Sequence, residues 1–290
     1  MSAIRKLLRP YIVTNDRFSM KDVDPDDTGG IKGKEAAAGA LKEDLERLCE
    51  LQERLYARGT WSLLLIFQAM DAAGKDSTIK HVMSGVDPQG CDVHAFKSPS
   101  TLELKHDFLW RAACVLPERG QIGIFNRSYY EEVLVVRVHP EFLEKQHIPG
   151  DVRHDDDIWE ERYEDIIGFE RHLHRNGTKV LKFFLHVSKD EQRKRFLARL
   201  EDPNKYWKFA AGDLTERALW KDYMTAYEDM IRGTATKDSP WFVVPADHKW
   251  FTRLVVAAAI VDALSAMDLK HPPLSNVQQK AIKAARQGLR

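Results

Sequence analysis

The sequence predicts an α/β fold in which helices cover both faces of a five-stranded parallel sheet, giving three layers. Five short apolar runs have the length of buried strands. Between them lie segments whose apolar residues recur every three or four positions, as in amphipathic helices. Strands that alternate with helices pair in parallel, because each helix carries the chain back to the edge where the previous strand began. No internal repeat divides the sequence, so we expect one domain over residues 1–290.

The first half begins with a polar lead-in, residues 1–34, which we expect to be extended and exposed. Leucines three and four positions apart then predict a long amphipathic helix. Gly85 is the expected end of the next helix, and Ser100 or Thr101 can cap the one after it. The expected elements are, in order, helix 34–58, strand 63–67, helix 77–85, strand 92–97, a helix that carries residues 104–112, and strand 121–125.

The second half begins with a loop-rich insertion over residues 135–160. Its acidic run 154–157 could suggest a metal site, but acids before a helix stabilise its N-terminus, and we favour that interpretation. Phe196 and Leu200 are expected to face inward on a basic helix that ends at Asp202-Pro203. The expected elements are helix 158–175, strand 179–187, the basic helix from Ser188, helix 214–232, strand 241–245, helix 251–267 and a basic tail over residues 270–290.

Composition excludes some classes of protein. Lys plus Arg and Asp plus Glu number 44 each, so no overall charge favours nucleic acid or a membrane surface, and an anionic ligand must be met by a local patch. The three cysteines, Cys49, Cys91 and Cys114, are widely spaced and in no metal-ligand pattern, which suits a reducing compartment. The sequence has neither a membrane-length apolar run nor a signal-peptide core, so we expect a cytoplasmic protein.

Residues 61–80 contain the clearest functional pattern. An apolar strand runs into a small-residue turn, Ala69 to Gly74, and then into Lys75 at the start of a helix. This order is typical of a phosphate-binding loop, where backbone N–H groups and the positive helix end hold phosphate oxygens. A plain helix start is the alternative, and the strand before it makes that alternative less favoured.

The loop departs from the pattern G-x-x-x-x-G-K-[ST] at two positions. Ala69 replaces the first glycine, and Asp76 replaces the hydroxyl residue that usually binds magnesium. Gly74 still supplies the backbone freedom next to the lysine. Asp71 is the candidate to take over the metal, because a carboxylate among loop amides would repel phosphate unless a cation bridged them.

Polar residues follow the strand at 121–125, where the carboxyl ends of parallel strands face the ligand-binding crevice. Asn126 stands where an ordinary phosphate-loop enzyme holds an aspartate that orients magnesium. Glu131 and Glu132 therefore become candidate metal ligands or acceptor-selecting groups, with a solvated first helical turn as the alternative. The residues expected to bind nucleotide or phosphate are Ala72, Ala73, Gly74, Lys75, Asp76, Ser77, Lys97, Asn126 and Arg127.

The chain turns basic after Ser188, and its cations outnumber the nearby acids. A solvated surface helix is one interpretation. We favour an anion-binding lid over approximately residues 189–213, because nucleotide kinases carry a mobile lid of arginines at this chain position. Its expected anion-binding residues are Arg193, Arg195, Arg199, Lys205 and Lys208.

Together these segments resemble a known family. The chain contains FQAMDAAGKDSTIK, FNRSYYEEVLVVRV, EQRKRF and DPNKYWKF in the order found in family-2 polyphosphate kinases, and the resemblance covers roughly residues 30–265. It implies a P-loop kinase fold and reversible transfer of the terminal phosphoryl group of inorganic polyphosphate to a nucleotide. The implied cofactor is magnesium, with manganese as the alternative, and the implied assembly is a homo-oligomer.

Most of that family reads D-R-S-W-Y-N where this chain has Asn126 and Glu131. In this the chain is similar to the subgroup that phosphorylates both AMP and ADP, with adenine or guanine as the base. The resemblance implies that Lys75 and Arg127 contact the transferred group and that Asp71, helped by Glu131 or Glu132, holds the metal. An ATP-dependent nucleoside-monophosphate kinase and a non-catalytic polyphosphate- or nucleotide-binding protein remain the alternatives.

Overall fold

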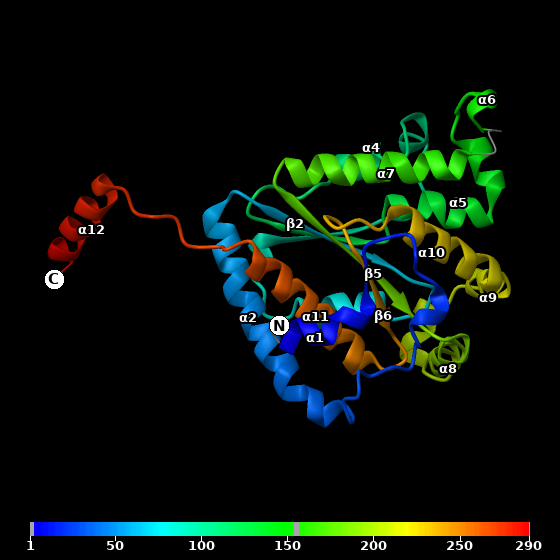
Figure 1. The fold of residues 1–290 in the computed structure, drawn as a ribbon, viewed down its shortest axis with the longest axis horizontal. Coiled ribbons are helices and arrows are strands. Elements are labelled where there is room, and N and C mark those ends of the chain that lie inside the picture. The colour runs from blue at the N-terminus through cyan, green and yellow to red at the C-terminus, as the bar shows by residue number, and fades with distance from the viewer. Residues whose placement is uncertain (1–2, 154–156, 290) are drawn as a thin grey trace.

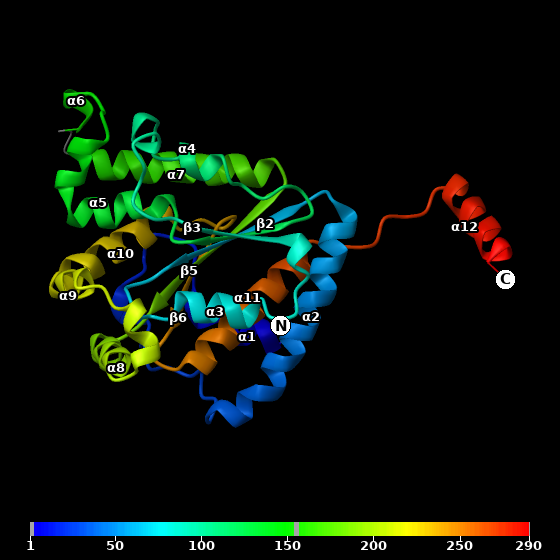
Figure 2. The same ribbon diagram turned by 180° about the vertical axis from the view of Figure 1, so that it is seen from behind.

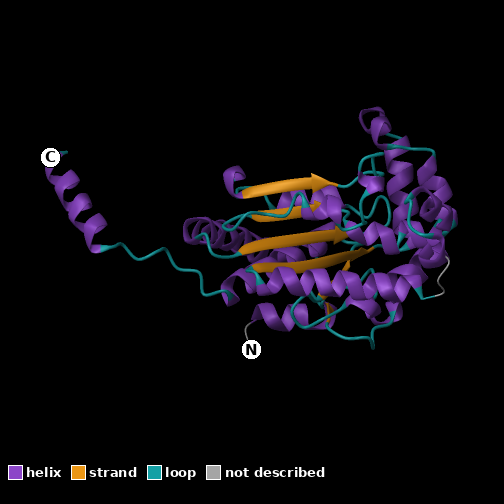
Figure 3. Ribbon diagram, turned by 90° about the horizontal axis from the view of Figure 1, so that it is seen from above, coloured by secondary structure: helices purple, strands orange, loops and turns teal. Residues whose placement is uncertain are grey.

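The computed structural model describes residues 3–153 and 157–289. Its sheet has six strands in the order β1-β6-β5-β2-β4-β3. Five of them are parallel, as predicted, and their arrows point the same way in Figure 3. The strands are β1 Ile12–Val13, β2 Ser62–Gln68, β3 Cys91–Ala95, β4 Ile122–Asn126, β5 Thr178–His186 and β6 Trp241–Pro245.

The predicted α/β class and the three layers are confirmed. α1, α2, α3 and α11 cover one face of the sheet, and α4, α5, α7 and α10 cover the other (Figures 1 and 2). The helices are α1 Ala3–Leu8, α2 Lys34–Arg58, α3 Lys75–Val82, α4 Trp110–Ala113, α5 Val135–Val138, α6 Gly150–Arg153, α7 Ile158–Arg175, α8 Lys189–Leu200, α9 Gly212–Ala218, α10 Trp220–Thr234, α11 Lys249–Ala266 and α12 Asn276–Gly288.

The core lies between the sheet and these helices. All seven residues of β2 are buried, and α2 turns Leu48, Leu51 and Leu55 toward α11, whose apolar residues are almost all buried. Phe67 on β2 stacks on Phe183 of β5 with ring centroids 5.0 Å apart. Each fully buried side chain of this size contributes about 1.5–3 kcal/mol to stability. The central strands are therefore a rigid base for the loops at their carboxyl ends.

The lead-in over residues 1–34 is not the exposed, extended segment that was predicted. It contains α1 and the short strand β1, which pairs antiparallel with β6 and makes the sheet six-stranded. Tyr11 is buried, meets Phe251 edge-on at 5.8 Å, and donates its hydroxyl to Asp27 Oδ2 at 2.7 Å. A two-residue strand has no periodicity, so only its tertiary pairing reveals it.

Three predicted helices differ in the structure. Ser100 is a cap, as expected, and exchanges hydrogen bonds with Glu103, but the turn lasts only three residues before α4. The helix predicted over 214–232 is split at Leu219 into α9 and α10. On α8, Phe196 is buried as predicted but Leu200 is 43% exposed.

The remaining differences concern the ends of segments and the tail. Asp157 occupies the N-cap position of α7, while residues 154–156 of the acidic run lie outside the described part of the chain. The basic tail folds as α12, capped by Ser275 and lying apart from the body (Figure 1). Within the described ranges, none of the helices combines the length and apolar character needed to cross a membrane.

Candidate active site

The loop between β2 and α3 has the backbone geometry of a phosphate-binding loop. Gly74 has φ 107°, and Ala72 also lies in the left-handed region with φ 61°. Lys75 Nζ donates to the Ala69 carbonyl at 2.8 Å, and the Ser77 hydroxyl donates to the Gly74 carbonyl at 2.9 Å. In the described part of the chain, the amides of residues 74–77 have no hydrogen-bond acceptor. These amides and the start of α3 can therefore hold phosphate oxygens.

Arg127 joins the end of β4 to this loop. Its amide donates to the Phe67 carbonyl at 3.0 Å, and its guanidinium lies 3.1 Å from Asp71 Oδ1 and 3.6 Å from Glu131 Oε2. The negative charge of Glu131 is the main cause that raises the pKa of Arg127. Burial lowers the pKa of Lys75, and the nearby Arg127 charge adds to this effect. Burial raises the pKa of Glu131, against the opposing charges of Arg127 and Lys75.

Asp76 and Asn126 form a pair at the mouth of the loop. The Asn126 amide donates to Asp76 Oδ1 at 2.6 Å. In an ordinary phosphate loop the helix supplies a hydroxyl and the strand supplies an aspartate. Here the carboxylate stands on the helix and the neutral group on the strand, so the two departures seen in the sequence compensate each other in space.

The structure separates Glu131 from Glu132. Glu132 is buried, lies 3.5 Å from Arg162, and accepts a hydrogen bond from Gln146 at 2.6 Å. Glu131 instead faces Arg127, which also contacts Asp71. Of the two glutamates predicted to help Asp71 hold a metal, Glu131 is thus the one that shares Arg127 with Asp71, whereas Glu132 contacts Arg162 and Gln146.

Two hollows meet at Arg127. A cleft of about 670 Å³ lies over the loop and the ends of β3 and β4, and its far wall carries lid residues. A smaller cavity of about 250 Å³ lies on the other side, with apolar walls that include Phe96, Val135 and Phe142. Lys97, Ser98 and Arg127 line both hollows.

Comparisons with known proteins agree with this geometry. The family model described as polyphosphate kinase 2 matches residues 32–272. The chain belongs to the polyphosphate kinase 2 family. It is thus a transferase, and the resemblance predicted from its motifs is confirmed.

The relatives cover almost the whole chain. The sequence is 52% identical to an ADP-polyphosphate phosphotransferase from Rhodopseudomonas palustris, over 89% of each protein. It is 45% identical to an AMP/ADP-polyphosphate phosphotransferase from Meiothermus ruber, over 95% of this chain and 99% of that protein. The crystal structure of polyphosphate kinase 2 from Arthrobacter aurescens TC1 superposes with a TM-score of 0.86 at 41% identity, covering 98% of this chain and 97% of that one.

The expected lid cations of this polyphosphate kinase 2 protein do not behave alike. Arg199, Lys205 and Lys208 line the large cleft, whereas Arg193 is exposed and does not. Lys249, at the start of α11, lines the same cleft and was not predicted. The sequence could have indicated Lys249, because the loop after the last parallel strand lies at the same edge of the sheet as the phosphate loop.

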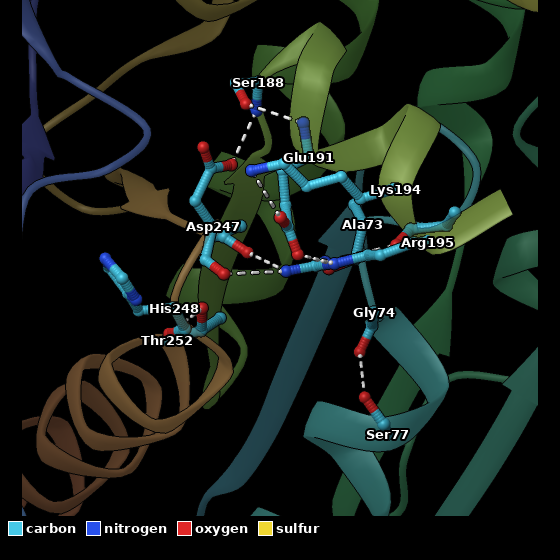
Figure 4. Close-up of polar contacts among 12 residues, drawn as sticks. Ala73, Gly74, Ser77, Ser188, Glu191, Lys194, Arg195, Asp247, His248 and Thr252 are labelled. Atoms are coloured by element: carbon cyan, nitrogen blue, oxygen red, sulfur yellow. Dashed lines mark hydrogen bonds and ion pairs between the residues drawn. The ribbon is translucent and has the colours of Figure 1, made fainter. Parts of the chain in front are cut away.

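Arg195 differs from the other predicted lid residues. It is buried, and its guanidinium donates to the carbonyls of Ala73 and Ala246 at 2.6 Å each and of Asp247 at 3.0 Å (Figure 4). Its Nε donates to Glu191 at 2.8 Å. Arg195 also lines the large cleft, but in this structure backbone carbonyls and Glu191 occupy its donors, so its role in anion binding stays a prediction.

Proposed function

We propose that the protein transfers the terminal phosphoryl group of inorganic polyphosphate to AMP and ADP, giving ADP and ATP. The observation that carries this proposal is the position of Arg127 where a cationic cleft meets a smaller, partly apolar cavity. The printed names of two relatives, which act on ADP or on AMP and ADP with polyphosphate, support the choice of donor and acceptors.

The large cleft suits a linear polyanion. Its cations include Lys75, Lys97 and Arg127 near the loop, and Arg199, Lys205, Lys208 and Lys249 on the opposite wall; Arg195, whose donors are occupied, lies between them in sequence and also lines the cleft. In a chain with equal numbers of acidic and basic residues, this is a local patch of the kind a polyphosphate donor needs. We therefore assign polyphosphate to this cleft and treat residues 189–213 as its lid.

The smaller cavity suits the acceptor nucleotide. Phe96, Val135 and Phe142 provide apolar walls for a base, while Lys97 and Lys145 can meet phosphate. An acceptor placed here would direct its terminal phosphate toward Arg127 and the loop. A phosphate oxygen of the acceptor then attacks the terminal phosphorus of the chain, and the bond to the next bridging oxygen breaks, which leaves polyphosphate one unit shorter.

The side chains act by placement and charge. Lys75 and the amides of residues 74–77 hold the phosphates that flank the transferred group, and Arg127 stabilises the charge on its equatorial oxygens. Asp71 orients the reactants from within the loop. The acceptor phosphate is largely ionised at neutral pH, so the mechanism needs no strong general base.

A divalent cation fits the oxygen donors that are present. Mg²⁺ usually takes one or two carboxylates together with substrate phosphates and water. Asp71 and Glu131 offer such carboxylates, and no larger cluster of metal-binding side chains occurs in residues 3–153 and 157–289. We assign Mg²⁺ to these two residues, with Mn²⁺ as the alternative; when bound, it neutralises charge between donor and acceptor.

The deciding experiment compares donors. AMP and ADP phosphorylation is measured with magnesium and either long-chain polyphosphate or ATP, and guanine nucleotides are tested alongside. Turnover of both adenine nucleotides with polyphosphate is expected. Turnover with ATP alone would instead make the protein a nucleoside-monophosphate kinase.

Variants test the assigned roles. Lys75→Ala and Arg127→Ala should each lower kcat by at least about 10²-fold, the scale of one lost transition-state donor. A loss of less than about tenfold in both variants would refute these roles. Asp71→Asn should bind polyphosphate but turn over poorly, which would exclude a binding protein without catalysis, whereas unchanged turnover would refute the role of Asp71.

A further inference from the structure

The outer side of the phosphate loop is held by one helix. Three successive loop carbonyls accept hydrogen bonds from α8: that of Asp71 from Gln192 at 2.9 Å, and those of Ala72 and Ala73 from Arg195 at 3.2 and 2.6 Å. Both side chains are buried, with Gln192 1% and Arg195 8% exposed.

These bonds set the direction of the loop amides. A peptide group is planar and trans, so its carbonyl and the following N–H point in opposite directions. Bonding the Ala73 carbonyl on the outside therefore turns the Gly74 N–H toward the cleft, where the unpaired amides of residues 74–77 begin. Ala72 has φ 61°, a conformation that a residue with a Cβ keeps only when its surroundings hold it.

Arg195 also ties the loop to the rest of the site. The other terminal nitrogen of its guanidinium donates to the carbonyls of Ala246 and Asp247, which lie in the loop between β6 and α11 (Figure 4). The Asp247 carboxylate in turn accepts the Ser188 amide at 2.7 Å, which fixes the start of α8. Gln192 is held by Arg217 of α9, which donates to its Oε1 at 2.7 Å. The loop, the lid helix and the start of α11 thus share one hydrogen-bond network.

We propose that Gln192 and Arg195 are positioning residues: they hold the carbonyls of residues 71–73 outward so that the loop amides face the phosphates. Arg195 then serves the reaction through the loop rather than by gripping polyphosphate. Only the kinetic test of this assignment depends on the proposed function, because it uses polyphosphate as the donor.

The test compares Arg195→Met and Arg195→Lys with the control Lys194→Met, an exposed neighbour on the same helix. Lysine keeps the charge but cannot span two pairs of carbonyls. Both Arg195 variants should lower kcat on the order of 10²-fold, the effect of a small misplacement of reacting groups. The KM for polyphosphate should stay within about threefold, and Lys194→Met should change neither constant.

Hydrogen exchange gives a second readout that needs no activity. In both Arg195 variants the hydrogen-bonded amides at the two ends of the loop, those of Ala73 and Thr78, should exchange at least about tenfold faster than in the parent and the control, while amides of the central strands keep their protection. This readout also separates the positioning role from the proposed function. If polyphosphate is not the donor, there will be no turnover to compare, but the change in hydrogen exchange will still be seen.

A KM for polyphosphate raised about tenfold with unchanged kcat would overturn the proposal, since that is the pattern of a residue that binds the donor directly. Full turnover in Arg195→Lys would overturn it too. If Arg195→Met does not fold, Gln192→Leu removes the bond to the Asp71 carbonyl together with the bond from Arg217, and it should lower kcat by about tenfold with the polyphosphate KM unchanged. Unchanged kcat and unchanged exchange in Gln192→Leu would refute its part in the assignment.

Discussion

A fully buried ion pair lies behind the site. Lys182 on β5 is 0% exposed, and its ammonium lies 2.7 Å from Glu170 of α7. The same ammonium donates to the Tyr130 hydroxyl at 3.1 Å and to the Thr234 carbonyl at 2.8 Å, so all three of its donors are used. Glu170 accepts the hydroxyls of Tyr129 and Tyr130 at 2.9 and 2.7 Å. Because Tyr129 and Tyr130 come two and three residues after Arg127, this network supports the site from within the core.

Removing one charge of this pair should be costly. Lys182→Met leaves the Glu170 carboxylate buried without its cation, and we expect a loss of about 3–5 kcal/mol in the free energy of unfolding. The double variant Lys182→Met/Glu170→Gln removes both charges but keeps an acceptor for the tyrosine hydroxyls. It should therefore recover about 2 kcal/mol or more of that loss, since neutral hydrogen-bonded groups are cheaper to bury than an unpaired charge.

Denaturant unfolding followed by tryptophan fluorescence and circular dichroism measures these free energies, with m-values checked for constancy. The single variants and the double variant form a thermodynamic cycle that isolates the coupling between Lys182 and Glu170. A cost below about 1 kcal/mol for Lys182→Met would refute the reasoning, as that is the value of an exposed pair. Costs that simply add in the double variant would also refute it.

Two further predictions concern stability. Burial, with the Glu43 charge, raises the pKa of Asp44 from 3.8 to about 6. Because the pKa of Asp44 is higher in the folded than in the unfolded chain, the protein loses stability as pH rises from about 4 through 6. Asp44→Asn removes this loss, so it should add about 3 kcal/mol to the free energy of unfolding near pH 8 and almost nothing below about pH 4. Denaturant curves at both pH values, with Glu53→Gln at an exposed site of the same helix as the control, check this, and an equal gain at both would contradict it. A Cβ on Gly233 would lie 2.5 Å from the Tyr163 ring, whereas one on Gly168 meets nothing within 4 Å. Gly233→Ala should cost about 1–3 kcal/mol, and Gly168→Ala should gain about 0.5–1 kcal/mol; the same sign for both in thermal unfolding would count against this view.

Periodicity predicted the elements that bury one continuous face. The bounds of α2, α7 and β6 agree with the sequence pattern, because their own apolar residues determine which side is buried. β1 could not be found this way, since its two residues take their place only by pairing with β6. Local pattern therefore defined the layers but not the edge of the sheet.

The same distinction between local and tertiary signals holds for the residues of the site. Lys75 and Gly74 were predicted because a phosphate loop is a local structure with a fixed spacing. Arg195 and Arg199 look alike in a basic run and both line the cleft, yet the donors of Arg195 meet backbone carbonyls whereas Arg199 lies 3.8 Å from Asp213. The only local signal was that Arg195 lies three residues after Gln192 and next to the inward-facing Phe196, on the side of α8 that packs against the protein.

The charges around the site explain why its two groups of cations have different roles. Next to the loop, Lys75 and Arg127 face three carboxylates, those of Asp71, Asp76 and Glu131. The loop alone therefore offers no excess of positive charge to a polyanion. Attraction has to come from the cations on the opposite wall of the cleft, Arg199, Lys205, Lys208 and Lys249. Removing charge from that wall should then raise the KM for polyphosphate and make it less sensitive to salt, while removing Lys75 or Arg127 should lower kcat. The two groups of cations do different work because carboxylates outnumber the loop cations Lys75 and Arg127 before the substrate arrives. On the opposite wall, Asp213 and Asp202 pair only with Arg199 and Lys205 among the described residues, which leaves an excess of positive charge there.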